Sequence, residues 1–139
     1  MLREAAAGPI EREAAELLID STPDDFYGVP AYRLVPRNPC ASPIEVHADR
    51  SATYIHVGHH RSLHELWQDD VEERRRQLHA CVVAVIGGGY GETREPWKKG
   101  SRLTMTFRTS DGPVEVIHHG SRLGDDLPLG TTTYEPYET

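Results

Sequence analysis

Histidine side chains gather in two short stretches of this sequence, and imidazole is the commonest protein ligand for transition metals. The chain has eight histidines, and six of them fall in these stretches: His56, His59, His60 and His64 in the first, His118 and His119 in the second. Three spaced four residues apart, together with one from the second stretch, make a four-ligand set of the kind that zinc prefers. The sequence therefore predicts a zinc or nickel site formed by His56, His60, His64 and His118.

Two other interpretations of the histidines stay open. In one, they are polar surface residues or helix caps. In the other, they form a pH-responsive cluster whose imidazolium groups repel one another as the pH falls. Their spacing matches no established metal motif, because His64-Glu65 lacks the second histidine of H-E-x-x-H. A metal-binding protein or metal-dependent enzyme is therefore an alternative functional prediction and not the leading one.

A second candidate site pairs an arginine with a carboxylate one helical turn away. At about 100° per residue, Arg74 points into the apolar stripe of a helix predicted over 62–89, and Asp70 lies beside it. An arginine oriented by its own carboxylate is suited to hold a carboxylate or phosphate. The sequence predicts small-anion binding here, with a half-solvated pair or a buried structural ion pair as the alternatives.

The leading functional prediction is a small non-catalytic protein, of an inhibitor or immunity type, that engages another protein. No serine lies in a G-x-S-x-G turn and neither cysteine has a base nearby in sequence, so no catalytic residue is predicted. Aromatic and arginine anchors are favoured at interfaces. The candidate interface residues come from a predicted loop and a predicted acidic helix: Tyr90, Trp97, Lys98, Lys99, Arg102, Glu11, Glu13 and Glu16. In the alternative interpretation, Trp97 packs on the sheet.

The predicted helix over 62–89 is the element around which the other elements are arranged. Ser62 and Glu65 have the spacing of a capping box at its start. Apolar residues then recur at helical spacing, and Gly87, Gly88 and Gly89 end the helix. A shorter first helix is predicted over 9–21, because Pro9 suits a first helical position and the residue before Pro23 disfavours helix.

Short extended segments make up most of the remaining predicted structure. Alternating apolar residues predict strands over 31–35, 44–48, 52–57, 102–109 and 114–119, with a polar, glycine-rich loop over 87–101. The order α-β-β-β-α-β-β predicts one α+β domain over 1–139, an antiparallel sheet of about five strands packed on the long helix. Residues 1–7 are expected to fray. Residues 122–139 are expected to be irregular, with Tyr134 and Tyr137 packed on the domain.

Composition and charge indicate which partners and which cellular compartment to expect for the protein. The net charge is −7, from 15 basic and 22 acidic side chains, which argues against non-specific nucleic-acid binding. No apolar run is long enough to span a membrane, and the acidic start is unlike a signal peptide. The two cysteines, Cys40 and Cys81, cannot build a disulfide framework. We therefore expect a cytoplasmic protein with reduced cysteines and no membrane partner.

Overall fold

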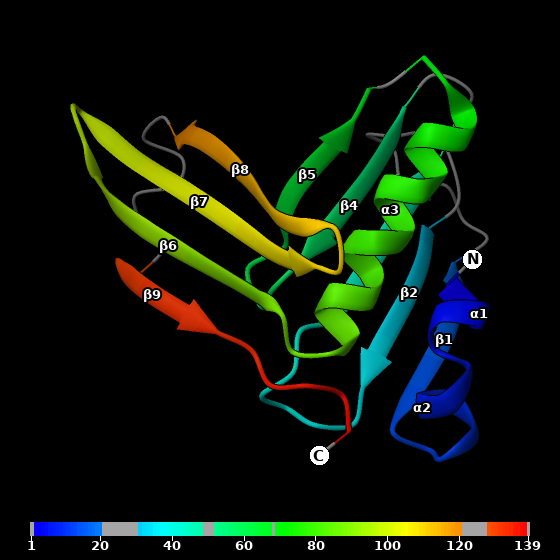
Figure 1. Cartoon of the computed structure of the whole chain (residues 1–139). Helices are drawn as coiled ribbons and strands as arrows, with labels where there is room; N and C mark the ends of the chain where they lie inside the picture. Colours follow the sequence, from blue (N-terminus) through cyan, green and yellow to red (C-terminus); the bar gives the residue numbers. More distant parts are fainter. Residues whose placement is uncertain (1, 21–30, 49–51, 68, 121–127, 139) are drawn as a thin grey trace.

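The computed structural model describes residues 2–20, 31–48, 52–67, 69–120 and 128–138. These form two antiparallel sheets and three helices (Figure 1). The five-stranded sheet follows chain order: β1 (Ala15–Asp20), β2 (Ala31–Pro36), β3 (Ile44–Ala48), β4 (Thr53–Val57) and β5 (Ser62–Leu66). The four-stranded sheet has the order β8 (Gly112–Gly120), β7 (Gly100–Thr109), β6 (Tyr90–Trp97) and β9 (Gly130–Thr133). The helices are α1 (Leu2–Ala5), α2 (Ala7–Glu11) and α3 (Val71–Ile86). The α+β class is confirmed, but two sheets replace the single predicted sheet.

Helix α3 lies against one face of the five-stranded sheet, and the four-stranded sheet lies beside it (Figure 1). In β3, the alternate residues Ile44 and Val46 belong to the core, as the period of two requires. The three elements share one buried core, to which they contribute Leu34, Ile44, Val46, Ile55 and Val57 from the first sheet, Leu78, Cys81, Val82 and Val85 from α3, and Tyr90, Met105 and Phe107 from the second sheet. Each such burial stabilises the fold by roughly 1.5–3 kcal/mol.

The predicted start of the long helix is wrong. Ser62 and Glu65 do not form a capping box, because Ser62–Leu66 is strand β5 and pairs antiparallel with β4. Helix α3 begins after Asp70, whose carboxylate accepts hydrogen bonds from the backbone N–H groups of Glu72 and Glu73. In β5, the side chains of residues 62, 64 and 66 face the core. The same residues also fit the spacing of a helical stripe, so the sequence alone does not distinguish the two periods. The predicted glycine stop is confirmed at Gly87.

The predicted first helix is also wrong for most of its length. Helix α2 ends at Glu11, and Glu13 takes a left-handed backbone conformation with φ of 57°. Residues 15–20 then form the edge strand β1, which pairs with β2 along its whole length. Only Leu17 of its apolar run faces the core, while Leu18 and Ile19 are exposed. Ser21, the predicted last residue, lies outside the described residues.

The predicted polar loop over 87–101 is in large part strand β6. It pairs with β7 from Tyr90 to Trp97, so the two strands form a hairpin that turns at residues 98–99. The alternation was masked by an inward-facing carboxylate, since Glu92 is only 7% exposed. Its Oε2 accepts hydrogen bonds from Tyr90 and Ser62, at 2.5 and 2.8 Å. The strands predicted over 31–35, 44–48, 52–57, 102–109 and 114–119 are confirmed as β2, β3, β4, β7 and β8, with the same ends for β3 and shifted ends for the others.

The C-terminal segment packs on the domain as expected, through Tyr134 and Tyr137. Both rings are buried, and the Tyr137 hydroxyl donates to the carbonyl oxygen of Ser42 at 2.7 Å. Strand β9, which precedes these tyrosines, pairs with β6. None of the helices in the described part of the chain is long and apolar enough to cross a membrane.

Candidate metal centre

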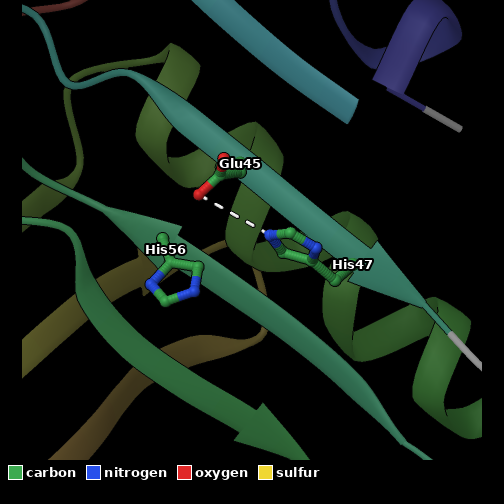
Figure 2. Close-up of side chains that lie close together, drawn as sticks. All are labelled: Glu45, His47 and His56. Carbon is green, nitrogen blue, oxygen red and sulfur yellow. Dashed lines mark ion pairs between the residues drawn. The ribbon is translucent and has the colours of Figure 1, made fainter. Parts of the chain in front are cut away.

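Two histidines and a glutamate meet on the face of the five-stranded sheet that points away from α3. Glu45 and His47 are two residues apart on β3, so both side chains project to the same face. His56 on β4 is the direct cross-strand partner of Glu45. Figure 2 shows the three side chains together on the two neighbouring strands, with the helix behind the sheet. The register of one hairpin therefore builds the whole cluster.

The three side chains are close enough to share one ion. Their candidate ligand atoms all lie within 4.8 Å of one another. Nε2 of His47 lies 3.6 Å from Oε2 of Glu45, the contact drawn as a dashed line in Figure 2. Ligand atoms at about 2.0–2.2 Å from a tetrahedral zinc are roughly 3.4 Å apart, so this separation needs little adjustment. The imidazole rings of His47 and His56 meet edge to face, with centroids 5.7 Å apart.

The turn between β4 and β5 orients the cluster through Arg61. The carbonyl oxygen of Arg61 lies 3.2 Å from Nδ1 of His56, and its guanidinium donates to Oε2 of Glu45 at 2.5 Å. Gly58 fixes the position of this turn, because its N–H donates to the Ser42 hydroxyl at 2.7 Å. If Nδ1–H donates to the Arg61 carbonyl, the lone pair of His56 sits on Nε2. A backbone partner of this kind is what fixes the tautomer of metal-binding histidines.

Burial and charge keep His56 and Glu45 in the protonation states that a metal needs. Burial lowers the pKa of His56, and this effect outweighs the Arg61 carbonyl bond that opposes it. The ring is therefore neutral near pH 7. Burial by itself raises the pKa of Glu45, but the bond from Arg61 and the nearby histidines bring the net pKa below its usual value. A carboxylate and a neutral imidazole are both competent ligands.

The four histidines predicted as a metal site are not assembled into one. Among the residues that the structure describes, Glu45, His47 and His56 are the group of three or more whose ligand atoms lie close enough to hold an ion. His56 is common to both sets, whereas His60 is exposed in the β4–β5 turn. His64 on β5 and His118 on β8 lie close enough together for the charge of His118 to lower the pKa of His64.

Asp70 and Arg74, predicted together as an anion site, have two different roles in the structure. The Asp70 carboxylate caps α3, and Arg74 is connected to Asp70 through its backbone N–H, which donates to the Asp70 carbonyl oxygen. The Arg74 side chain is 5% exposed and lines a cavity between α3 and the five-stranded sheet. An anion-binding role for Arg74 stays a prediction, without Asp70 as the group that orients it.

The predicted interface residues lie in three places. Tyr90 is 1% exposed and belongs to the core, so it is not available at a surface. Trp97 is half-exposed next to the turn that holds Lys98 and Lys99, and the guanidinium of Arg102 lies 4.6 Å above its ring. The three acidic residues are exposed, but they belong to three different elements: Glu11 to α2, Glu13 to a turn and Glu16 to β1. The acidic helical face that the prediction invoked does not exist.

Sequence reasoning missed Glu45 and His47 although a signal for both was present. The alternation over 44–48 already placed these two residues on one face, and the short link over 49–51 already predicted pairing with the next strand. Setting the two strands in register would have placed His56 beside Glu45. The dense histidines over 56–64 predict a local cluster instead, because spacing along the chain carries no information on pairing between strands.

Comparisons with known proteins give no match. No protein-family model, no curated protein and no solved structure is significantly similar to this chain. The functional argument therefore rests on the geometry described above.

Proposed function

We propose that this protein binds a divalent transition-metal ion, with zinc as the best-suited ion and nickel as the second, through Glu45, His47 and His56. The observation that carries the proposal is the convergence of three candidate ligand atoms within 4.8 Å on one hairpin. Two imidazole nitrogens and one carboxylate oxygen form an established zinc-binding set. A water molecule or a small anion would complete a tetrahedral shell.

The burial of the ligands favours a stabilising role for the ion over catalysis. His47 is fully buried and His56 is 9% exposed, while the Glu45 side chain is 17% exposed and is bordered by Arg33 and Arg61. The three ligands therefore present little surface from which a substrate could reach the ion. An ion held by β3 and β4 together cross-links the centre of the five-stranded sheet, and its binding free energy adds to folding.

A metal-free explanation of the cluster also follows from these contacts. Glu45 lies 2.5 Å from Nη2 of Arg61 and 3.9 Å from Nε of Arg33. These two ion pairs can neutralise the carboxylate without any metal. The two models differ in what zinc does to the protein. A cluster held only by ion pairs is not stabilised by zinc, whereas a metal centre is.

Zinc titration of tag-free protein separates the two models. We expect stoichiometric binding by calorimetry and a higher melting temperature in zinc, reversed by a chelator, because an ion that binds only the native state stabilises it by mass action. His56→Gln and Glu45→Gln should each weaken binding at least tenfold, since a ligand is lost. His79→Gln, at an exposed histidine on α3, is the matched control and should bind like the wild type. A wild type indifferent to zinc would leave the ion-pair model standing.

The leading prediction from sequence is that the protein binds another protein. Only one of its two predicted surfaces is still a candidate. The residues Trp97, Lys98, Lys99 and Arg102 at the β6–β7 turn still form a candidate surface. The predicted acidic helix is instead a short helix, a turn and the start of an edge strand. Metal binding is therefore the function with the stronger geometric support, and protein binding stays a prediction.

A further inference from the structure

Strand β8 forms an open edge of the four-stranded sheet. Among the residues that the structure describes, it pairs with β7, and no other strand lies beyond it in the sheet (Figure 1). No residue of β8 is buried, whereas β7 alternates between buried and partly exposed residues over most of its length. Ile117 is 52% exposed and Val114 is 37% exposed. An exposed edge strand with apolar side chains is a template for pairing with another strand.

The hairpin geometry determines which backbone groups of β8 point outward. The turn between β7 and β8 has two residues, so Thr109 and Gly112 face each other as the first hydrogen-bonded pair of the ladder. Hydrogen-bonded pairs then alternate with pairs that are not hydrogen-bonded. The even-numbered residues of β8 therefore bond to β7, and the odd-numbered residues from 113 to 119 direct their N–H and C=O groups away from it. Pro113, which has no N–H, occupies one of these outward positions, as proline does on edge strands.

The side chains of the odd-numbered residues lie on the outer face of the sheet. Glu115 and Ile117 flank Val116, which packs against the core from the other face. Glu115 and His119 are exposed on either side of Ile117. The His119 ring lies against that of Trp97, with centroids 5.4 Å apart. An acidic, an aliphatic and an imidazole side chain thus follow one another along the outward edge.

We propose that β8 pairs antiparallel with β8 of a second copy of this chain, around a two-fold axis at Ile117. In this register the two Ile117 side chains meet, and Glu115 of each chain lies opposite His119 of the other. An imidazole N–H donates to a carboxylate in either protonation state of the ring, and such cross-strand pairs stabilise a sheet. Each facing pair of outward residues exchanges two backbone hydrogen bonds. The two four-stranded sheets then join into one continuous sheet.

The order of side chains along this edge favours a second copy over an unrelated strand, because it is self-complementary. Over the described length of β8, the register centred on Ile117 is the one two-fold register that sets Glu115 opposite His119. A register centred on Glu115 would instead place two carboxylates opposite each other, which destabilises a sheet. A two-fold interface uses the same surface of both chains and is the commonest symmetry of oligomers. The proposal does not depend on metal binding, since β8 carries none of the candidate ligands.

Sedimentation equilibrium of the full chain, from about 10 μM to 1 mM, tests the proposal. A chelator is present, so that no metal ion bridges histidines of two chains. We expect a reversible equilibrium between monomer and dimer. Amide hydrogen exchange should slow with rising concentration at Glu115, Ile117 and His119, whereas Val116, whose N–H bonds to β7, should be protected throughout. A protein that stays monomeric over this range, or a dimer with unchanged exchange at the three outward amides, would overturn the proposal.

Two charge variants test the register. Glu115→Lys sets a cation opposite His119, and His119→Glu sets a second carboxylate opposite Glu115. Each variant alone should dimerise about tenfold more weakly than the wild type, because two symmetry-related pairs are lost. An equimolar mixture of the two should form a heterodimer, since the two substituted positions then face each other with opposite charges and the two native residues face each other as before.

The matched control is Glu11→Lys, the same change of charge at an exposed position of α2. It should dimerise like the wild type. Equal losses in Glu115→Lys and Glu11→Lys would show an effect of net charge alone. That result, or two single variants that fail to pair when mixed, would overturn the assignment of β8 as the interface.

Discussion

His64, on β5, lies near His118 of β8, in a partly buried place where the charged form of the His64 ring is disfavoured. Burial lowers the pKa of His64, the neighbouring His118 lowers it further, and Glu65 opposes both effects. The His64 ring also lies 5.8 Å from that of Phe107. Other charged groups line the cavity next to His64 from α3 and from the β7–β8 hairpin: Glu73, Arg76, Asp111 and Glu115. In the folded protein, His64 therefore serves as a neutral, half-buried packing residue.

This arrangement predicts that acid destabilises the protein through His64. Because the pKa of His64 is lower in the folded state than its ordinary value of 6.5, the unfolded state binds more protons between the two values. The free energy of unfolding should therefore fall as the pH drops below about 6.5 and continue to fall until the pH passes the folded-state pKa. Urea unfolding of the wild type and of His64→Gln from pH 7.5 to 5 should show a smaller decline in the variant.

The control for this experiment is His60→Gln, at an exposed position of the β4–β5 turn. It should keep the pH dependence of the wild type. A decline that is the same in the wild type and His64→Gln would contradict the role given to His64.

At the scale of single residues, the sequence identified the right residue types and placed only some of them correctly. His56 is predicted as a metal ligand and lies in the candidate centre, and Cys81 lies in the core. Burial raises the pKa of the Cys81 thiol to about 12, so it remains protonated at neutral pH. Glu45 and His47 were overlooked because their partner lies across a hairpin, and cross-strand register is not visible in local spacing.

At the scale of elements, the start of α3 shows how two periodicities can overlap. Residues 62–66 carry apolar side chains that fit both a helical stripe and a strand, and pairing with β4 decides for the strand. The helix begins where a side chain can cap it. Asp70 does so, with its Oδ1 2.9 Å from the N–H of Glu72 and 3.4 Å from that of Glu73. A capping box can be proposed from sequence, but tertiary pairing decides which candidate cap is used.

The cap predicts a measurable loss of stability on substitution of Asp70. Asp70→Ala should lower the free energy of unfolding by about 1 kcal/mol, because two N–H groups lose their acceptor and the negative charge at the helix start is removed. Asp70→Ser should retain most of the stability. Asp69→Ala, with the same change one residue earlier at an exposed position, should change it by less than about 0.5 kcal/mol. Equal effects at positions 69 and 70, measured by urea unfolding, would contradict the assignment of the cap.

At the scale of the whole molecule, the C-terminal segment holds the two sheets and α3 together. The Tyr137 N–H donates to the Ile86 carbonyl oxygen at the end of α3, and the Tyr134 hydroxyl accepts from the His59 N–H at the β4–β5 turn. Tyr134 also stacks on Tyr90 of the second sheet, with centroids 5.5 Å apart. Sequence reasoning expected these tyrosines to pack inward but could not place them, because all their contacts are distant along the chain.

Gly88 is where this segment crosses the end of α3 most closely. Its φ is +80°, and an added Cβ would lie 2.7 Å from the backbone nitrogen of Pro136. Gly88→Ala should therefore lower the free energy of unfolding by roughly 1–3 kcal/mol, through backbone strain and displacement of the segment. Gly87→Ala is the matched control, because its Cβ would come no closer than 3.4 Å to another atom. Thermal unfolding of both variants checks this, and a stable Gly88→Ala protein would show that the segment packs differently.

The metal content of two histidine variants tests the central claim most directly. Tag-free wild type, His47→Gln and His60→Gln are dialysed against zinc and then against metal-free buffer, and zinc per chain is measured by elemental analysis. We predict close to one zinc in the wild type and in His60→Gln, and background zinc in His47→Gln with circular dichroism like that of the wild type. Background zinc in the wild type, or loss of zinc from His60→Gln with retention in His47→Gln, would contradict a centre built from Glu45, His47 and His56.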